Sequence, residues 1–282
     1  MKKAGKLKKI MFRVFSWGLE FWVRIRPEQV GHLLMGWFTI PRTAKAFSFP
    51  EGFQNDFRQG DFTLNDGHQV AFYDWGGQGP KILLLHGWES NASRWHDLAI
   101  QLVKEGYAPI AIDAPAHGKS TGEKFTVLEY GRWLEELVPQ VEPFAVVGHS
   151  AGGMAILVAS KTISKSAKKA VVKATPAGLE SLFDYFRRLV HLGAHSFQSF
   201  ELAFEGEFGK PYRDFTALDY IKEEMPSGLI LHDQLDEVIP EEEARLIAQN
   251  WKNADLVWTR GLGHSQKSPE IYRRIIDFLK EK

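Results

Sequence analysis

Pro143-Phe144-Ala145-Val146-Val147-Gly148-His149-Ser150-Ala151-Gly152-Gly153 is an apolar run that ends in a glycine-rich turn. The apolar half predicts a buried strand, and the small apolar residues that continue to Ser160 predict a helix. Glycines on both sides of Ser150 permit a tight turn between the two elements. A strand, a sharp turn and a helix in this order present the serine hydroxyl above a sheet. The same pattern places the Ala151 N–H at a helix N-terminus, where it can face a developing negative charge.

Strand and helix patterns alternate on both sides of this turn. The further strands are predicted at 81–85, 107–112, 170–174, 228–231 and 256–259, and the helices at 94–105, 126–138, 241–251 and from 268 onward. Ahead of them, Asn65-Asp66-Gly67 predicts a hairpin between residues 61–64 and 69–75. This order predicts an α/β fold, with a mostly parallel central sheet and helices on both faces.

One segment interrupts the alternation. About 50 residues lie between Ala174 and Gly228, which is too long for a plain strand-to-helix connection. The segment has helical character and many aromatic residues, namely Phe183, Tyr185, Phe186, Phe197, Phe200, Phe204, Phe208, Tyr212, Phe215 and Tyr220. We therefore predict an N-terminal helical extension over 1–56, a core over 57–176 and 227–282, and an inserted helical lid over 177–226.

The composition excludes several kinds of chemistry. The 282 residues suit one large α/β domain with an insertion, and 44% apolar with 25% charged residues is ordinary for a globular protein. Zero net charge gives no global field that would favour nucleic acid. The absence of cysteine excludes disulfides, thiolate zinc sites, iron–sulfur clusters and a cysteine nucleophile, and is compatible with a reducing cytoplasm, where we expect the protein.

The N-terminal segment differs from the rest in charge. Residues 1–30 hold eight basic residues against two acidic ones, a net charge of +6, so the remainder carries −6. Residues 6–25 predict a helix with a narrow polar stripe and a broad apolar face. Arg13 interrupts the apolar run, which argues against a signal peptide and against a span of about 20 residues across a membrane. Two alternatives remain: the helix packs on the protein itself or on a second copy, or it lies at the surface of an anionic membrane.

Three residues that could act together each follow a predicted strand. They are Ser150, Asp236 and His264, in that order along the chain. Reactive groups in open α/β sheets collect at the carboxyl ends of the strands. A serine hydroxyl needs a base, histidine has a suitable pKa, and a carboxylate on the second ring nitrogen holds the imidazole in place. Singly, each residue is more commonly a turn or loop residue, but together in this order they predict a catalytic triad.

With these motifs, residues from about 57 to 282 resemble the α/β-hydrolase family. The motifs that carry the resemblance are His86-Gly87-Trp88, Asp113-Ala114-Pro115-Ala116-His117-Gly118-Lys119-Ser120, the turn at Gly148–Gly152, the Asp236-Glu237-Val238-Ile239-Pro240 run and the Gly261-Leu262-Gly263-His264 loop. The chain departs from the family at Ala116 and Asp233, where glycine is commoner. Asp233 is therefore a rival to Asp236 as the acid.

The resemblance implies a role for each matching residue. Ser150 would be the nucleophile, His264 the base and Asp236 its orienting acid, with the backbone N–H groups of Trp88 and Ala151 as the oxyanion hole. The expected activity is a serine hydrolase that cleaves an ester or related small acyl compound through an acyl-enzyme, with no cofactor and no metal. The alternative is a ligand-binding or receptor-type protein of the same fold with little turnover.

Two expectations concern the surroundings of the site. His86, His117 and His149 lie in motif loops, where shaping the site is a commoner role than proton transfer or metal binding. The aromatic residues of the insertion suggest an apolar acyl or aromatic substrate, although packing within the insertion would require such residues as well. The side chain of Trp88 would narrow the pocket and favour small acyl groups.

Overall fold

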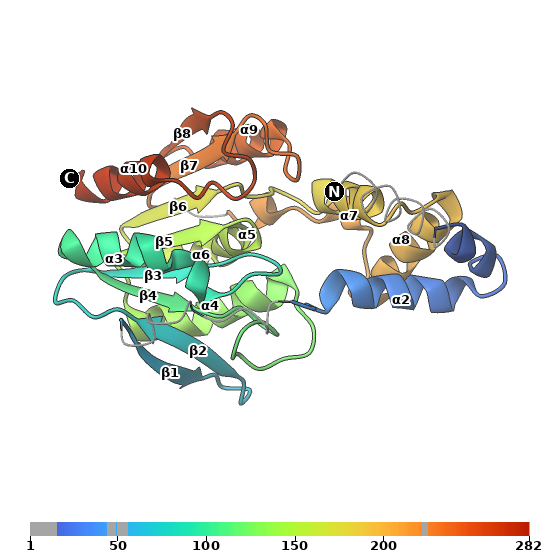
Figure 1. Cartoon of the computed structure of the whole chain (residues 1–282), viewed down its shortest axis with the longest axis horizontal. Coiled ribbons are helices and arrows are strands. Elements are labelled where there is room, and N and C mark those ends of the chain that lie inside the picture. The colour runs from blue at the N-terminus through green and yellow to red at the C-terminus, as the bar shows by residue number, and fades with distance from the viewer. Residues whose placement is uncertain (1–15, 44–48, 50–55, 222–224, 282) are drawn as a thin grey trace, which may run out of the picture. The chain divides into compact units, whose positions relative to one another are not determined.

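The computed structural model describes residues 16–43, 49, 56–221 and 225–281 (Figure 1). Their contacts divide the chain into two compact units. One comprises Met1–Thr39 with Gly178–Thr216, and we call it the helical unit. The other comprises Ile40–Ala177 with Ala217–Lys282, and we call it the sheet unit. Part of the helix predicted at 6–25 lies outside the described residues.

The sheet unit is built on eight strands in the order β1-β2-β4-β3-β5-β6-β7-β8. Their bounds are β1 (Arg58–Thr63), β2 (Gln69–Asp74), β3 (Lys81–Leu85), β4 (Ala108–Ile112), β5 (Ala145–His149), β6 (Lys169–Lys173), β7 (Ser227–Asp233) and β8 (Ala254–Thr259). Strands β1 and β2 form the predicted antiparallel hairpin, and β2 pairs antiparallel with β4. All other pairs are parallel, which confirms the predicted fold class.

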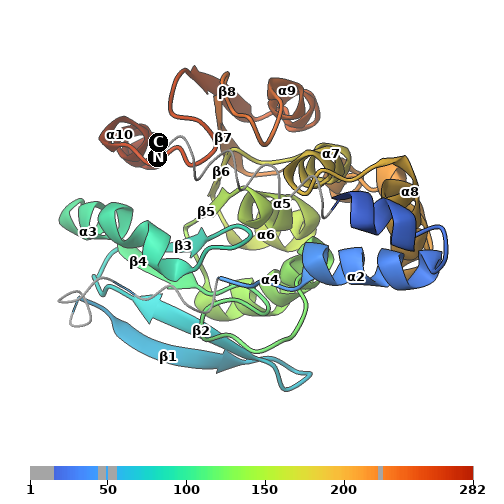
Figure 2. The same ribbon diagram turned by 45° about the vertical axis from the view of Figure 1, so that its right-hand side comes forward.

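Helices cover both faces of this sheet. They are α3 (His96–Lys104), α4 (Val127–Val141), α5 (Ala151–Val158), α6 (Ser160–Ser166), α9 (Glu241–Asn250) and α10 (Pro269–Lys280), with single 3₁₀ turns η2 (Ala92–Trp95) and η4 (Ala217–Tyr220). Helices α3 and α10 pack on one face, and α4, α5 and α6 on the other (Figure 2). The predicted caps are present: Thr126 Oγ1 accepts from Glu129 N–H at 3.1 Å, and Ser268 Oγ from Ile271 N–H at 3.2 Å.

The central strands carry the core of the sheet unit. In β3 the side chains of Ile82 to Leu85 are all fully buried, as expected for a parallel strand covered on both faces. Alternate residues therefore face opposite layers: Ile82 and Leu84 belong to the cluster that contains α3 and α10. The predicted helix at 94–105 begins instead as the 3₁₀ turn η2, because Asn91 caps it by accepting from Ser93 N–H.

The helical unit combines two segments that are far apart in the sequence. Residues 16–22 are helical and a turn follows, so this helix ends before the predicted Ile25. The unit continues with α2 (Pro27–Thr39), α7 (Glu180–Leu189), α8 (Ala194–Phe208) and the 3₁₀ turn η3 (Tyr212–Asp214). Helices α2 and α8 approach closely at Gly31, where a Cβ would lie 2.5 Å from the Ser199 carbonyl oxygen. Ser199 Oγ also donates to the Pro27 carbonyl.

Aromatic rings form the core of the helical unit. The ring of Phe183 stacks on Tyr212 with centroids 3.9 Å apart and on Phe200 at 4.5 Å. Phe38 of α2 meets Phe183 edge-on at 4.9 Å and Phe200 at 5.3 Å. The N-terminal residues thus share one core with the inserted segment. Within the described ranges, no helix has the length and apolar character needed to cross a membrane.

Candidate active site

Ser150 occupies the turn between β5 and α5 with an unusual backbone. Its φ of 53° and ψ of −122° lie outside the regions that L-residues favour, at a cost of roughly 1–3 kcal/mol. The glycines around it are required by close contacts. A Cβ on Gly148 would lie 2.6 Å from Gly153 Cα, and one on Gly152 would lie 2.5 Å from the Leu85 carbonyl oxygen. Strand and helix can therefore meet tightly enough to force the turn and to project Ser150 from it.

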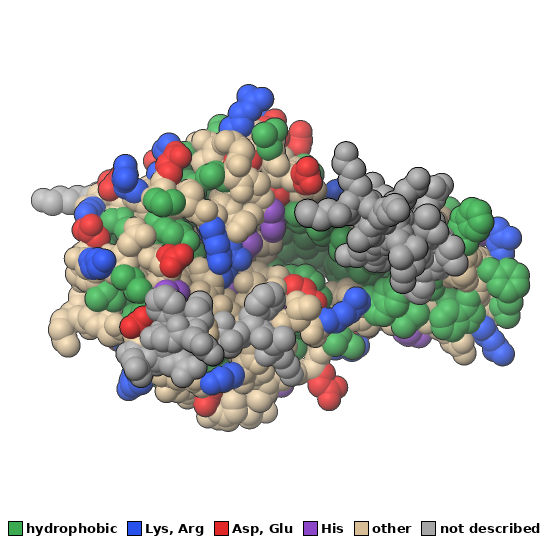
Figure 3. All heavy atoms as spheres, in the orientation of Figure 1, with side chains coloured by type: hydrophobic (Ala, Val, Ile, Leu, Met, Phe, Trp, Pro, Cys, Tyr) green, Lys and Arg blue, Asp and Glu red, His purple; other side chains and the backbone are tan. Residues whose placement is uncertain are grey.

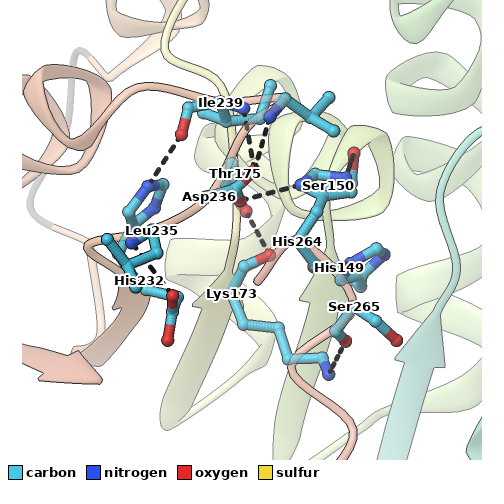
Figure 4. A network of polar contacts seen from close by, with 12 residues as sticks. His149, Ser150, Lys173, Thr175, His232, Leu235, Asp236, Ile239, His264 and Ser265 are labelled. Carbon is cyan, nitrogen blue, oxygen red and sulfur yellow. Dashed lines mark hydrogen bonds and ion pairs between the residues drawn. The ribbon is translucent and has the colours of Figure 1, made fainter. Parts of the chain in front are cut away.

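The three residues predicted to act together lie within hydrogen-bond distance in the sheet unit (Figure 4). His264 Nε2 is 3.2 Å from Ser150 Oγ, and His264 Nδ1 is 2.8 Å from Asp236 Oδ2. The Asp236 side chain is fully buried, whereas about a quarter of the His264 side chain (24%) is exposed. The imidazole therefore bridges a buried carboxylate and the hydroxyl, and it keeps partial access to solvent.

The two candidate acids have different partners. Asp236 Oδ1 accepts from Val238 N–H at 2.8 Å and Ile239 N–H at 3.0 Å, which leaves Oδ2 directed at His264. Asp233 instead accepts from Thr259 Oγ1 and Leu262 N–H, both at 2.9 Å. Burial alone would raise the pKa of Asp233, but these hydrogen bonds lower it overall. Asp233 thus fastens the loop that leads to His264, and Asp236 contacts the imidazole.

The loop that carries Trp88 runs directly along the serine turn. A Cβ on Gly87 would lie 2.9 Å from Ser150 Cβ and 3.3 Å from Ala151 N, so glycine is needed for this approach. The Trp88 ring packs against His117 and Phe125, with centroids 5.4 and 5.5 Å away. The structure therefore brings Trp88 and Ala151, the two predicted donors of the oxyanion hole, into neighbouring backbone segments beside Ser150.

Two buried, neutral histidines, His86 and His117, hold the loop that carries Trp88. His86 Nε2 accepts from Ala114 N–H at 2.9 Å, and its Nδ1 lies 2.8 Å from the Gly87 carbonyl. His117 Nε2 accepts from Glu89 N–H at 3.2 Å. Burial lowers the pKa of His86 and of His117 to about 3. Both rings are thus fixed hydrogen-bond partners in the loops that flank the serine turn.

The motif after β4 is tied together by Asp113. Its carboxylate accepts from Ala92 N–H at 2.8 Å, Tyr73 Oη at 2.9 Å and Lys119 N–H at 3.0 Å. Within this motif Ala116 adopts a φ of 62°, a left-handed conformation that is unfavourable for any residue with a Cβ. This geometry accounts for the glycine that is commoner at that position.

Three donors fasten the chain that carries His264. His149 Nε2 lies 2.9 Å from the His264 carbonyl, and Lys173 Nζ donates to the Ser265 carbonyl at 3.2 Å (Figure 4). Lys173 Nζ also donates to the Gln266 carbonyl at 3.1 Å. Arg94 Nη2 also donates to the Ser265 carbonyl at 3.2 Å. Three consecutive carbonyls, 264 to 266, are therefore held by side chains from other elements. We call His149, Lys173 and Arg94 the carbonyl clamp.

The sequence reasoning did not single out Lys173 or Arg94. Lys173 is 1% exposed, and burial holds its pKa well below the usual range of lysine. A lysine directly after the apolar run Ala170-Val171-Val172 is the signal that could have marked it. Among the residues that the structure describes, no cluster of three or more His, Cys, Asp or Glu side chains could hold a metal ion.

Comparison with known proteins places this geometry in a family. A family model described as the alpha/beta hydrolase family matches residues 82–271. The chain belongs to the alpha/beta hydrolase family.

Sequence relatives match part of the chain. A bifunctional esterase/perhydrolase of Acinetobacter calcoaceticus is 30% identical over 125 residues, which are 42% of this chain and 45% of the relative. A non-heme chloroperoxidase of Kitasatospora aureofaciens is 33% identical over 95 residues, 32% of this chain and 34% of the relative. The matches thus span between a third and a half of these relatives' own lengths.

Solved structures of this fold cover more of the chain. An esterase of Pyrococcus furiosus aligns with a TM-score of 0.64 at 22% identity, over 86% of this chain and 97% of its own. An esterase of Exiguobacterium antarcticum aligns with a TM-score of 0.61 at 18% identity, over 79% of this chain and all of its own (100%). At these identities the likeness shows the shared alpha/beta hydrolase fold.

Proposed function

We propose that the protein is a serine hydrolase that cleaves a carboxylic ester or a related acyl compound through an acyl-enzyme. The observation that carries this proposal is the continuous hydrogen-bond path from Ser150 Oγ through the His264 ring to Asp236. A serine hydroxyl is unreactive at neutral pH without such a base. The strained turn and the neighbouring backbone of Trp88 and Ala151 support the same chemistry.

In this mechanism His264 Nε2 takes the proton of Ser150 Oγ as that oxygen attacks the carbonyl carbon. The carboxylate of Asp236 keeps the proton of the imidazole on Nδ1 and stabilises the imidazolium as it forms. The negative charge that develops on the substrate oxygen is met by the N–H groups of Trp88 and Ala151, the latter at the N-terminus of α5. The fixed neutral rings of His86 and His117 keep that loop in place.

The attack of Ser150 forms a tetrahedral intermediate. Its collapse breaks the bond to the alcohol oxygen, which receives the proton from His264. A water molecule then attacks the acyl carbon while His264 takes its proton. The bond between the acyl carbon and Ser150 Oγ breaks, His264 returns the proton to that oxygen, and the acid is released. The N–H groups of Val238 and Ile239 hold Asp236 throughout, so that its carboxylate orients the imidazole.

The direct test is hydrolysis of short p-nitrophenyl esters by the wild-type protein and by the Ser150→Ala and His264→Ala variants. We expect each substitution to lower kcat by several orders of magnitude, as the loss of one triad residue does in other serine hydrolases. Full esterase activity in Ser150→Ala would contradict the proposal.

The acyl group is a separate question. Phe183, Phe200 and Tyr212 of the insertion are buried in the core of the helical unit. Packing within this unit accounts for these rings, so they are not evidence for an aromatic substrate. Trp88 remains the candidate for a limit on acyl size. A series of p-nitrophenyl esters tests this: a preference for short chains that shifts to longer ones in Trp88→Ala supports it, and a wild-type preference for long chains contradicts it.

A further inference from the structure

The helix at residues 16–22 and the turn that follows it have an inner and an outer apolar face. On the inner face Leu19 and Val23 are 3% and 4% exposed. Glu20 also points inward, where its carboxylate accepts from Ser196 N–H at 2.8 Å and lies 3.1 Å from His195 Nδ1. These contacts dock the segment on the helical unit, as one of the two sequence-based alternatives requires.

The outer face is apolar and open to solvent. Four large side chains lie on it: Trp17 is 76% exposed, Phe21 68%, Ile25 61% and Trp22 40%. Hydrophobic side chains gather at this part of the helical unit, with basic side chains beside them (Figure 3). Exposed aromatic and aliphatic residues grouped in this way mark a binding surface, because single scattered ones are the norm elsewhere. Docking on the helical unit therefore buries the inner apolar side chains of this segment and leaves the outer ones exposed.

The charge around this face is positive. Arg24 and Arg26 are exposed beside it, and one exposed carboxylate, Glu28, follows two positions after Arg26. The only acidic residue between positions 1 and 27, Glu20, is turned inward. Residues 1–15, which lead directly into the helix, contain six Lys or Arg and no Asp or Glu. A binding partner of this face must therefore have an apolar interior beneath a negatively charged surface layer.

We propose that the outer face of residues 17–25 binds the surface of an anionic lipid membrane. Tryptophan and phenylalanine prefer the boundary between headgroups and acyl chains, and basic residues near an anionic surface contribute about 1 kcal/mol each. A second copy of this chain fits less well, since a twofold contact through the same face would bring two segments of net charge +6 together. The two sequence-based alternatives thus apply to opposite faces of one helix.

The test is flotation of the full chain with vesicles of phosphatidylcholine and phosphatidylglycerol at 7:3, and with phosphatidylcholine alone. We expect the wild type to float with the anionic vesicles and to be released by high salt, because the basic residues are screened. Replacing Trp17, Phe21 and Ile25 by serine should reduce binding at least tenfold. The matched control is Leu202→Ser, which removes an exposed leucine (61%) of the same helical unit and should bind as the wild type.

Three results would overturn the proposal. One is no flotation with anionic vesicles. Another is equal binding by the triple variant and the wild type. The third is a wild-type oligomer, measured by light scattering, that is absent in the triple variant, when neither the wild type nor the variant binds lipid. This result would assign the face to contact with a second copy of the chain. Hydrolysis of a soluble ester should be unchanged in the triple variant, which verifies that the sheet unit is folded and separates this proposal from that of the catalytic mechanism.

Discussion

Asp233 is the last residue of β7 and Asp236 lies three positions after it, and the hydrogen bonds of the two carboxylates distinguish them. Asp236 Oδ2 lies 2.8 Å from the His264 ring, whereas Asp233 accepts four hydrogen bonds, from Thr259, Leu262, Leu235 and Gly261. In the sequence, the Val238-Ile239-Pro240 run favoured Asp236 as the acid and left Asp233 as a rival. The hydrogen bonds of Asp233 depend on the pairing of β8 with β7, which brings Thr259 and Leu262 beside this carboxylate. Residues close in the sequence do not determine that pairing.

Substitution of each aspartate by asparagine should therefore give different losses. Asp236→Asn is expected to lower kcat by about 10⁴ with little loss of stability, because the amide favours the wrong tautomer of His264. Asp233→Asn is expected to lower the free energy of unfolding by about 1–3 kcal/mol, because an amide NH₂ cannot accept from the surrounding donors. Ester kinetics and urea denaturation of the two variants measure both quantities, and the reverse pattern would make Asp233 the acid.

The carbonyl clamp predicts a role for Lys173 that acts through His264. We expect Lys173→Met to lower kcat by about 10–100-fold with KM nearly unchanged, because a small displacement of the base is costly to the reaction. Lys169 is a matched control on the same strand: it is also buried and donates to the carbonyls of Phe278 and Glu281, away from Ser150. Lys169→Met should lose stability but keep its kcat, and equal kcat in both variants would remove the positioning role.

At the scale of elements, regular patterns were the predictable part. The hairpin, the strand at Lys81–Leu85 and the caps at Thr126 and Ser268 lie where the sequence predicts them, because each is decided by residues close in the chain. The pairing of α2 with α8 could not be predicted, since it joins segments far apart through small residues such as Gly31. Helix α6 (Ser160–Ser166) was not predicted, because its mostly polar sequence lacks the apolar periodicity that marks a helix.

The helix pair predicts a contrast between two glycines. Gly31→Ala should destabilise the protein by about 1–3 kcal/mol, because its Cβ would lie 2.5 Å from the Ser199 carbonyl oxygen of α8. Gly18 is helical and no atom lies within 4 Å of a Cβ there, so Gly18→Ala should be neutral or stabilising by up to about 1 kcal/mol. Thermal denaturation compares the two, and equal effects would mean that close α2–α8 packing does not contribute to stability.

For the whole molecule, the neutral histidines couple stability to pH. His86 and His117 have pKa values of about 3, below the 6.5 of an exposed histidine. As the pH falls below about 6.5, the unfolded chain binds protons at these sites and the folded chain does not, so these sites lower stability by up to about 1.4 kcal/mol per pH unit each. Ring signals of both residues in NMR spectra should keep their neutral positions between pH 8 and 5. Titration near pH 6.5 would contradict the buried, neutral assignment.

The central claim is that Ser150 is an activated nucleophile, and covalent labelling tests it most directly. Intact-mass spectrometry after treatment with a fluorophosphonate should show one adduct on the wild-type protein, located at Ser150 by peptide mapping. Ser150→Ala should remain unmodified, and Asp236→Asn should label far more slowly than Asp233→Asn. A wild-type protein that stays unmodified would instead support the alternative of a ligand-binding protein with little turnover, and an adduct that persists in Ser150→Ala would place the nucleophile elsewhere.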